Sequence, residues 1–387
     1  MQVLNITNYE KNLTLGSLKE VLDYLPIILV LGIIAGFGSF TTLIGAFILS
    51  LVFLIFGKKY SFIFAPTVAF VLSAASINVS LGGKSETLFA LLFVSSLLTI
   101  LISLLNVHKK TLLTIPKPVI SGFMTGCFVS ALMLSIPLMF GQKTFSSLPL
   151  MLNSKVSLFS NVNEISIVFS CLTFAIYYYF SKSKIKILPS AFLAVIFTGF
   201  INYFHGFNLE NIYIGIKAFT PVATADFGHF IRLLFSGILL SLVIVVETLL
   251  NLKISKKMNG MTKSPKKPLF LLGLANALAS ITGSVGGTLA IRNENGKKKL
   301  LTLIEAVVLF FFIMFFEKIS SFIPICAIGS ILFIKSYEII KNYILAQKIK
   351  IFSSKIIFAI CLFATLYNVI FGLIVSIVFA LIVETRK

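Results

Sequence analysis

The chain has 387 residues, of which 58% are hydrophobic and only 12% are charged. Apolar runs of about 17–25 residues recur along it, and a helix of that length spans the ~30 Å hydrocarbon layer of a bilayer. The formal net charge of +20 does not indicate nucleic-acid binding, because the basic residues stand in short loops between apolar runs, where they orient a membrane protein. The composition therefore predicts an all-α polytopic membrane protein and excludes a soluble nucleic-acid-binding domain.

Taken in chain order, the apolar runs predict two successive sets of helical segments. The first set, in a repeat spanning 17–204, is 17–35, 41–56, a short 66–77, 86–107, 119–140, 164–180 and 187–204. The second set, in a repeat spanning 230–387, is 230–252, 268–282, a short piece near Thr288, 300–316, 323–334, 356–366 and 369–383. We expect residues 1–16 to form a cytoplasmic segment and residues 205–229 to connect the repeats on the other side.

Loop charge predicts how the chain is oriented. Lysine-rich loops, such as those around Lys58, Lys109 and Lys184, alternate with loops that carry only single lysines. Because basic loops stay in the cytoplasm, this alternation predicts an even number of crossings, about fourteen counting half-spans, and both termini inside. The N-terminus has no cleavable signal peptide pattern, and the lysine-rich loops suit a bacterial inner membrane.

Two short segments at corresponding places in the halves indicate broken helices. They read "SFIFAPTVAFVLSAA" from Ser61 and "GSVGGTLAI" from Gly283, and such a pair is typical of an inverted-repeat transporter with its site near the midplane. Pro66 suits the first position of a helix. The free amides after it, at Thr67, Val68 and Ala69, would form one side of a partly positive pocket for an anion.

These residues resemble the SulP family of anion transporters. The likeness runs without gaps from about Gly16 to Ala75, and further stretches are similar to family signatures: "IPKPVISGFMTG", "VIVVETLLNLKI", "LLGLANALASITGSVGG" and "FIPICAIGSILFI". The resemblance implies a fold of seven plus seven inverted helices with two short half-helices at the midplane, a substrate-carrying core domain, and a gate domain that often forms a homodimer. We expect the membrane domain alone, without the family's C-terminal STAS domain.

The chain departs from the family pattern at two places near the expected site. Ala65 stands where the family usually has glycine before the proline, which adds a methyl group beside the anion pocket. The region after Thr288 is contracted, since 50 residues separate Pro66 from Pro116 whereas 36 separate Thr288 from Pro324. This contraction predicts that one half of the anion cradle is incomplete.

The resemblance and the polar residues in apolar runs together nominate two groups of site residues. Glu247 falls where the family carries an acidic residue, and with Thr248 and Asn251 it is expected to bind a coupling ion, H⁺ or Na⁺, because buried acids in membranes usually serve ion paths. The alternative is a structural hydrogen bond between helices. The expected substrate-binding residues are Ala65, Pro66, Thr67, Val68, Thr288 and Arg292, although Arg292 could equally begin the basic loop that follows.

Three further predictions concern residues outside these two groups. Asp23 is expected to be a structural charge paired with Lys19 one turn earlier. Glu305 is expected to have a structural or interfacial role, and Phe64 is expected to face the core or the lipid rather than the substrate. The four cysteines and three histidines show no disulfide or metal-ligand spacing, so we expect neither a disulfide framework nor a metal or other cofactor.

The function predicted from these observations is secondary transport or exchange of a small inorganic anion: bicarbonate, sulfate or chloride. The chain has no phosphate-binding glycine loop and no catalytic motif, so neither an ATP-driven pump nor an enzyme is indicated. Two alternatives stay open: a nucleobase transporter of the same fold, and a non-transporting paralogue that acts as a membrane scaffold.

Overall fold

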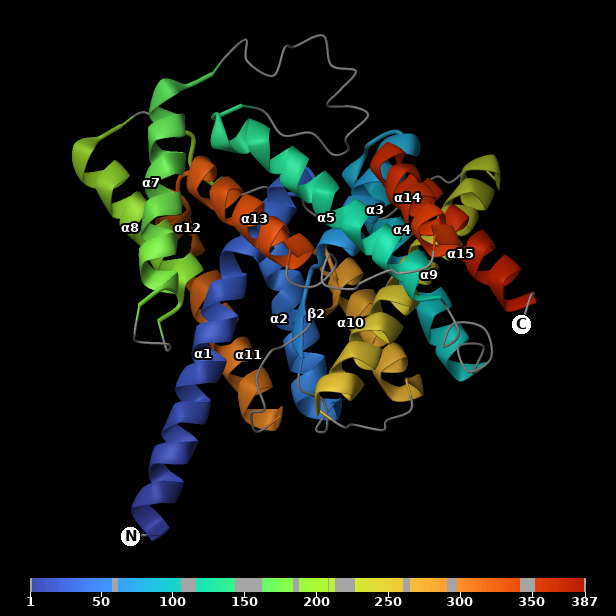
Figure 1. Cartoon of the computed structure of the whole chain (residues 1–387), viewed down its shortest axis with the longest axis horizontal. Helices are drawn as coiled ribbons and strands as arrows, with labels where there is room; N and C mark the ends of the chain where they lie inside the picture. Colours follow the sequence, from blue (N-terminus) through green and yellow to red (C-terminus); the bar gives the residue numbers. More distant parts are fainter. Residues whose placement is uncertain are drawn as a thin grey trace.

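The computed structural model describes residues 2–57, 62–105, 116–142, 162–183, 188–207, 209–212, 227–259, 265–290, 298–341 and 352–385. Nearly all of them are helical (Figure 1). The first half contains α1 (Gln2–Ile34), α2 (Ser39–Phe56), β1 (Ile63–Ala65), α3 (Val68–Ser80), α4 (Ser85–Leu104), α5 (Lys117–Met139), α7 (Glu164–Ser181) and α8 (Ser190–His205). The second half contains α9 (Phe227–Asn259), α10 (Lys266–Ile281), β2 (Thr288–Ala290), α11 (Lys298–Met314), α12 (Phe316–Ser320), α13 (Ile325–Ile339), α14 (Phe352–Tyr367) and α15 (Val369–Thr385).

The predicted helical segments are present, with three corrections. First, α1 begins at Gln2, so most of the expected N-terminal segment 1–16 is helical. Second, the chain around Thr288 is a strand and not the start of a half-helix, and residues 291–297, which follow it, lie outside the described part. Third, the short helix α12 has no counterpart in the prediction. In the described residues, five helices are long and apolar enough to cross a membrane by length and composition.

The packing of the helices repeats itself between the two halves. Helix α4 packs on α9 and α10, while α11 packs on α1 and α2. In the same way α7 packs on α13, α14 packs on α5, and the pairs α7–α8 and α14–α15 lie at opposite sides of the view in Figure 1. Exchanging the halves reproduces the same contacts, as the inverted-repeat prediction requires.

These contacts separate the bundle into two groups of helices. The core group contains α1 to α4, α9 to α11 and both strands, and the gate group contains α5, α7, α8 and α13 to α15. The groups meet where α1 packs on α8 and α13 and where α3 packs on α5 and α15. The boundary between the two groups therefore runs alongside α1 and α3.

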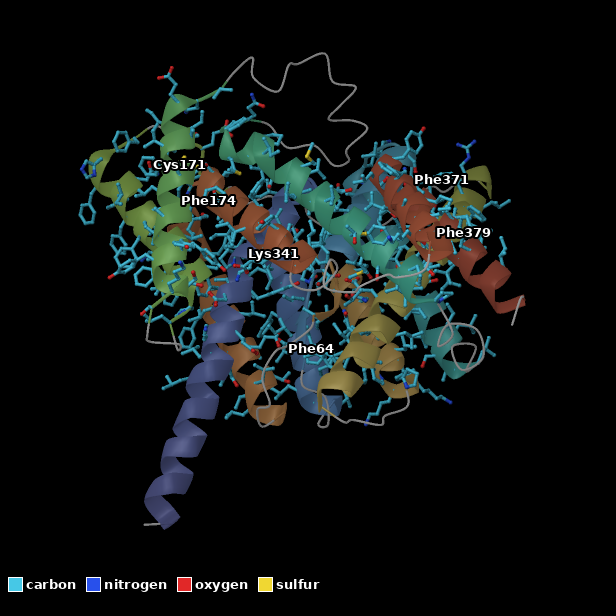
Figure 2. All side chains as sticks on the ribbon, viewed as in Figure 1. Phe64, Cys171, Phe174, Lys341, Phe371 and Phe379 are labelled. Carbon is cyan, nitrogen blue, oxygen red and sulfur yellow. The ribbon has the colours of Figure 1, made fainter. Side chains whose placement is uncertain are left out.

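The outer surface of the bundle is apolar. Phe363 and Tyr203 each expose more than two thirds of their surface, and Phe371 exposes half. Figure 2 shows Phe371 towards the edge of the bundle, whereas Phe64 lies among the central helices and is fully buried. Broad exposure of large apolar side chains suits a surrounding of lipid and not of water.

The strands β1 and β2 cross the middle of the core group as an antiparallel pair. Ile63 pairs with Ala290, Phe64 with Leu289, and Ala65 with Thr288. All six residues are buried. The ring of Phe64 stacks on Phe53 of α2 with 3.9 Å between the centroids, which confirms that it is a core residue. This two-stranded ribbon joins the short segments that the sequence marks in the two halves.

Candidate functional site

Glu247 of α9 lies where the ribbon meets the start of α3. Its Oε2 accepts a 2.8 Å hydrogen bond from the hydroxyl of Thr67, and Thr67 Oγ1 lies 2.9 Å from Thr288 Oγ1. The Thr288 hydroxyl is also a hydrogen-bond partner of the Glu247 carboxylate, so its single proton can go either to Glu247 or to Thr67 Oγ1. The three side chains therefore form one hydrogen-bonded cluster, and Glu247 exposes only 3% of its surface.

The N-terminus of α3 faces this hydrogen-bonded cluster. The helix begins at Val68, with Thr67 as its N-cap, and the Thr67 side chain makes no capping hydrogen bond. Pro66 was predicted to be the first helical residue, but it lies outside the helix, and its carbonyl accepts a bond of 3.3 Å from Tyr24. Proline restricts the preceding residue to extended conformations, and Ala65 is accordingly in β1. The first intrahelical bond runs from the Val71 amide to the Thr67 carbonyl, so the amides of Val68 and Ala69, as predicted, and that of Phe70 have no partner within the helix.

The polar patch expected on α9 is smaller than predicted. Thr248 donates to the carbonyl of Ile244 in its own helix at 2.6 Å, so its hydroxyl does not join the site. Asn251, one turn after Glu247, donates from Nδ2 to the carbonyl of Leu289 in β2. Its other amide atom, Oδ1, is buried without a hydrogen-bond partner. Asn251 therefore brings one unused acceptor to the same face of α9 as Glu247.

Two residues that hold the ribbon had not been nominated for the site. Glu305 of α11, predicted to be structural, accepts from the amide of Phe64 at 2.8 Å through Oε1. Asn276 of α10 accepts from the amide of Gly287 at 2.8 Å and donates to its carbonyl at 3.0 Å. The available signal was a lone amide side chain in an apolar helix, "LLGLANALAS", because such a group is costly in a membrane unless it is hydrogen-bonded.

The structure gathers most of the nominated residues and leaves one undescribed. Ala65, Pro66, Thr67 and Val68 run from β1 into α3, and Thr288 lies opposite Ala65 in the register of the ribbon. Ala65 is fully buried. Arg292 lies outside the described residues, so its predicted contact with an anion stays a prediction, as does the incomplete cradle.

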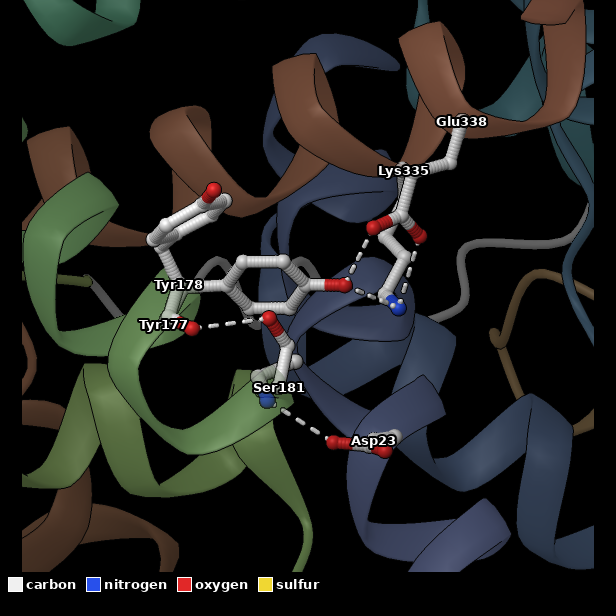
Figure 3. A network of polar contacts seen from close by, with 7 residues as sticks. Asp23, Tyr177, Tyr178, Ser181, Lys335 and Glu338 are labelled. Carbon is white, nitrogen blue, oxygen red and sulfur yellow. Dashed lines mark hydrogen bonds and ion pairs between the residues drawn. The ribbon is translucent and has the colours of Figure 1, made fainter. Parts of the chain in front are cut away.

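Asp23 belongs to a second polar cluster, between α1 and the gate group (Figure 3). Its Oδ1 accepts from the amide of Ala191 at the start of α8 at 2.8 Å. Nearby, Lys335 donates to the hydroxyl of Tyr177 at 2.8 Å and to Glu338 at 3.2 Å, and Tyr177 donates to Glu338 at 2.6 Å. Asp23 therefore caps the start of α8 and links the core group to the gate group, and its predicted pairing with Lys19 stays a prediction.

The fold and site define an inverted-repeat membrane protein with a buried polar site where its two halves meet. The characteristic sequence pattern of the sulfate permease family matches residues 21–364. The chain therefore belongs to the sulfate permease family.

Known relatives agree with this assignment. The chain is 24% identical over 360 residues to the bicarbonate transporter BicA of Synechocystis sp.. The aligned region covers 86% of this chain and 62% of that protein. Over 409 residues the chain is 23% identical to the putative sulfate transporter YvdB of Bacillus subtilis, covering 99% of this chain and 75% of that protein. The chain thus spans less than two thirds of the BicA relative. The solved transmembrane domain of a cyanobacterial BicA shares the fold, with a TM-score of 0.80 at 23% identity over 93% of this chain and 96% of that one.

Proposed function

We propose that this protein is a secondary transporter or exchanger of a small inorganic anion. The observation that carries the proposal is the buried hydrogen-bonded cluster of Thr288, Thr67 and Glu247, placed at the N-terminus of α3. Hydroxyl groups and free helix amides are donors that suit an anion. Bicarbonate and sulfate are the first candidates, because one relative is a bicarbonate transporter and another a putative sulfate transporter. Chloride is the third candidate.

Glu247 is the group that would couple the anion to a cation. At about 4 Å, two unit negative charges repel by about 4 kcal/mol at an effective dielectric constant of 20, which corresponds to roughly a thousandfold loss of affinity. A proton on Glu247, or a Na⁺ held between Glu247 and the unused Oδ1 of Asn251, would remove that repulsion. Binding of the cation and binding of the anion would then favour each other.

Transport would follow from movement of the core group against the gate group. Polar links between them include the hydrogen bond from the Ala191 amide to Asp23 of α1, the attraction between Asp23 and Lys335 of α13, and the bond from Asn368 before α15 to Ser76 of α3 at 3.2 Å. Much of the other contact between the groups is apolar packing of α1 and α3 on gate helices. The named links would have to break or rearrange during the movement.

We also infer the setting of this activity from loop charge. Basic loops place both termini in the cytoplasm of a bacterial inner membrane, with lipid around the bundle and a homodimer as one option for assembly. Single cysteines introduced into the lysine-rich loops can be labelled from each side of the membrane, and reaction only from outside would contradict this orientation.

Uptake of labelled bicarbonate, sulfate and chloride into proteoliposomes tests the proposal. The purified wild type and Glu247→Gln would be compared under imposed pH and Na⁺ gradients. We expect gradient-driven uptake of at least one anion by the wild type, and uptake without gradient dependence in Glu247→Gln, because the amide cannot carry a charge. Uptake of a nucleobase alone would favour the nucleobase alternative, and no uptake of any substrate would favour the scaffold.

A further inference from the structure

A two-stranded ribbon inside a membrane bundle leaves backbone hydrogen-bonding groups unpaired at its edges. Backbone amides and carbonyls that point away from the partner strand have no water to bind, and each unsatisfied group costs several kcal/mol in an apolar interior. In two antiparallel strands, opposite residues alternate between hydrogen-bonded and non-hydrogen-bonded pairs, and residues of a non-hydrogen-bonded pair point their amides and carbonyls away from the partner strand. Phe64 and Leu289 form such a pair here, since the Phe64 amide and the Leu289 carbonyl both bond to side chains outside the ribbon.

Three core helices supply the missing partners. Glu305 of α11 takes the amide of Phe64 on the β1 edge, and Asn251 of α9 takes the carbonyl of Leu289 on the β2 edge. Asn276 of α10 binds both backbone groups of Gly287, the residue directly before Thr288. Asn276 therefore binds Gly287 through both its donor and its acceptor, as a neighbouring strand would. Glu305 and Asn251 each make one such bond to the ribbon.

The backbone before Thr288 packs closely against its neighbours, and three glycines allow this close approach. A Cβ on Gly287 would collide with the carbonyl of Ala65, and one on Gly286 would collide with Asn276 Oδ1. A Cβ on Gly45 of α2 would collide with the carbonyl of Val285. The segment before Thr288 is thus enclosed by α2 and β1 and held by the Asn276 amide.

We propose that Asn276 is a positioning residue for the anion site. By binding the amide and the carbonyl of Gly287, it sets the place of Thr288, so that the Thr288 hydroxyl lies 2.9 Å from Thr67 and can donate to it. Asn276 itself does not bond to Glu247, Thr67 or Thr288 in the described contacts, so it acts through the backbone. The expected change in KM rests on the proposed transport function, whereas the expected change in the position of Thr288 does not.

Kinetics test the consequence. Asn276→Ala removes both bonds to Gly287, and the matched control is Ser280→Ala, one turn further on α10, whose equally buried hydroxyl bonds only to the carbonyl of Ala277 in its own helix. We expect the apparent KM of the transported anion to rise about tenfold or more in Asn276→Ala, with the maximal rate per folded protein little changed. A merely structural role would lower the amount of active protein and leave KM at the wild-type value, which would overturn the proposal.

A second measurement does not depend on transport. In a full-length chain with its four cysteines replaced by alanine, Thr67→Cys and Thr288→Cys place two thiols where the hydroxyls meet. Their oxidation to a disulfide, which needs the two sulfur atoms about 2 Å apart, reports the spacing directly. We expect Asn276→Ala to slow this cross-link about tenfold, while Ser280→Ala leaves the rate unchanged. Equal rates in all three backgrounds would refute the positioning role.

The two measurements separate the possible failures. If the wild type transports none of the three anions, the proposed function is wrong. The cross-linking rates alone then test whether Asn276 positions Thr288. If Asn276→Ala does not fold, Asn276→Ser replaces it, because serine keeps a polar group at this buried position but puts one shorter-reaching oxygen in place of the two amide atoms that bind Gly287. It is expected to change KM and the cross-linking rate in the same direction.

Discussion

Thr67→Val removes the hydroxyl at the centre of the site while keeping the size and β-branching of the side chain. Thr67 donates to Glu247 and bonds to Thr288, so valine breaks both bonds and leaves a buried carboxylate without that donor. It costs no capping bond, because the Thr67 side chain makes none on α3. The effect should therefore arise from the site and not from loss of helix α3.

The size of the effect follows from the bond that is lost. A hydrogen bond to a charged group contributes about 1.5–3 kcal/mol, and a neutral one about 1 kcal/mol. If about 2 kcal/mol of this sum is expressed in anion binding, the apparent KM rises roughly 30-fold. Thr67→Ser keeps the hydroxyl, so we expect its KM to stay near that of the wild type.

Anion uptake into proteoliposomes measures KM for the three proteins, and thermal unfolding in detergent measures their stability. We expect Thr67→Val to have the raised KM and a lower unfolding midpoint, because Glu247 remains buried with one donor fewer. The reasoning would be refuted if Thr67→Val had the KM and the unfolding midpoint of the wild type. It would also be refuted if Thr67→Ser were impaired as strongly as the valine variant.

Four further substitutions test parts of the fold. Gly45→Ala should abolish the folded protein, since its Cβ would meet the carbonyl of Val285. Gly82→Ala has open space and only the strain of a φ of 103°, so it should cost about 1–3 kcal/mol. The yields of the two folded variants by size-exclusion chromatography check this difference. Asn163→Ala removes the N-cap that accepts from two amides of α7, and a loss of about 1 kcal/mol in the free energy of unfolding is expected; an unchanged unfolding curve would contradict the cap. Lys335→Met leaves Glu338 without its cation, so the unfolding midpoint should fall slightly; because this pair is partly exposed, a loss well above about 1 kcal/mol would be unexpected.

The helices were largely predictable, because a chain in lipid must satisfy its backbone within each segment and reveals this as long apolar runs. The runs of α2, α4 and α7 contain little else, and their boundaries in the structure lie within three residues of the prediction, whereas α9 continues seven residues past its predicted end, to Asn259. Glu247 could be nominated for the same reason, since a carboxylate is conspicuous in such a run. The ribbon could not be predicted, because three residues such as "TLA" carry no periodic signal.

The contrast between Thr248 and Asn276 shows where sequence reasoning ends. Thr248 is adjacent to Glu247 in the chain, yet its hydroxyl bonds to its own helix, while Asn276 is 29 positions away from Glu247 and holds the residue before Thr288. The pattern of apolar runs and loop charges was enough to predict a chain of two related halves that spans a membrane, with an acid among its apolar helices. Which hydroxyl, amide and carboxyl groups meet depends on the packing of helices distant in sequence, because hydrogen bonds act only over about 3 Å.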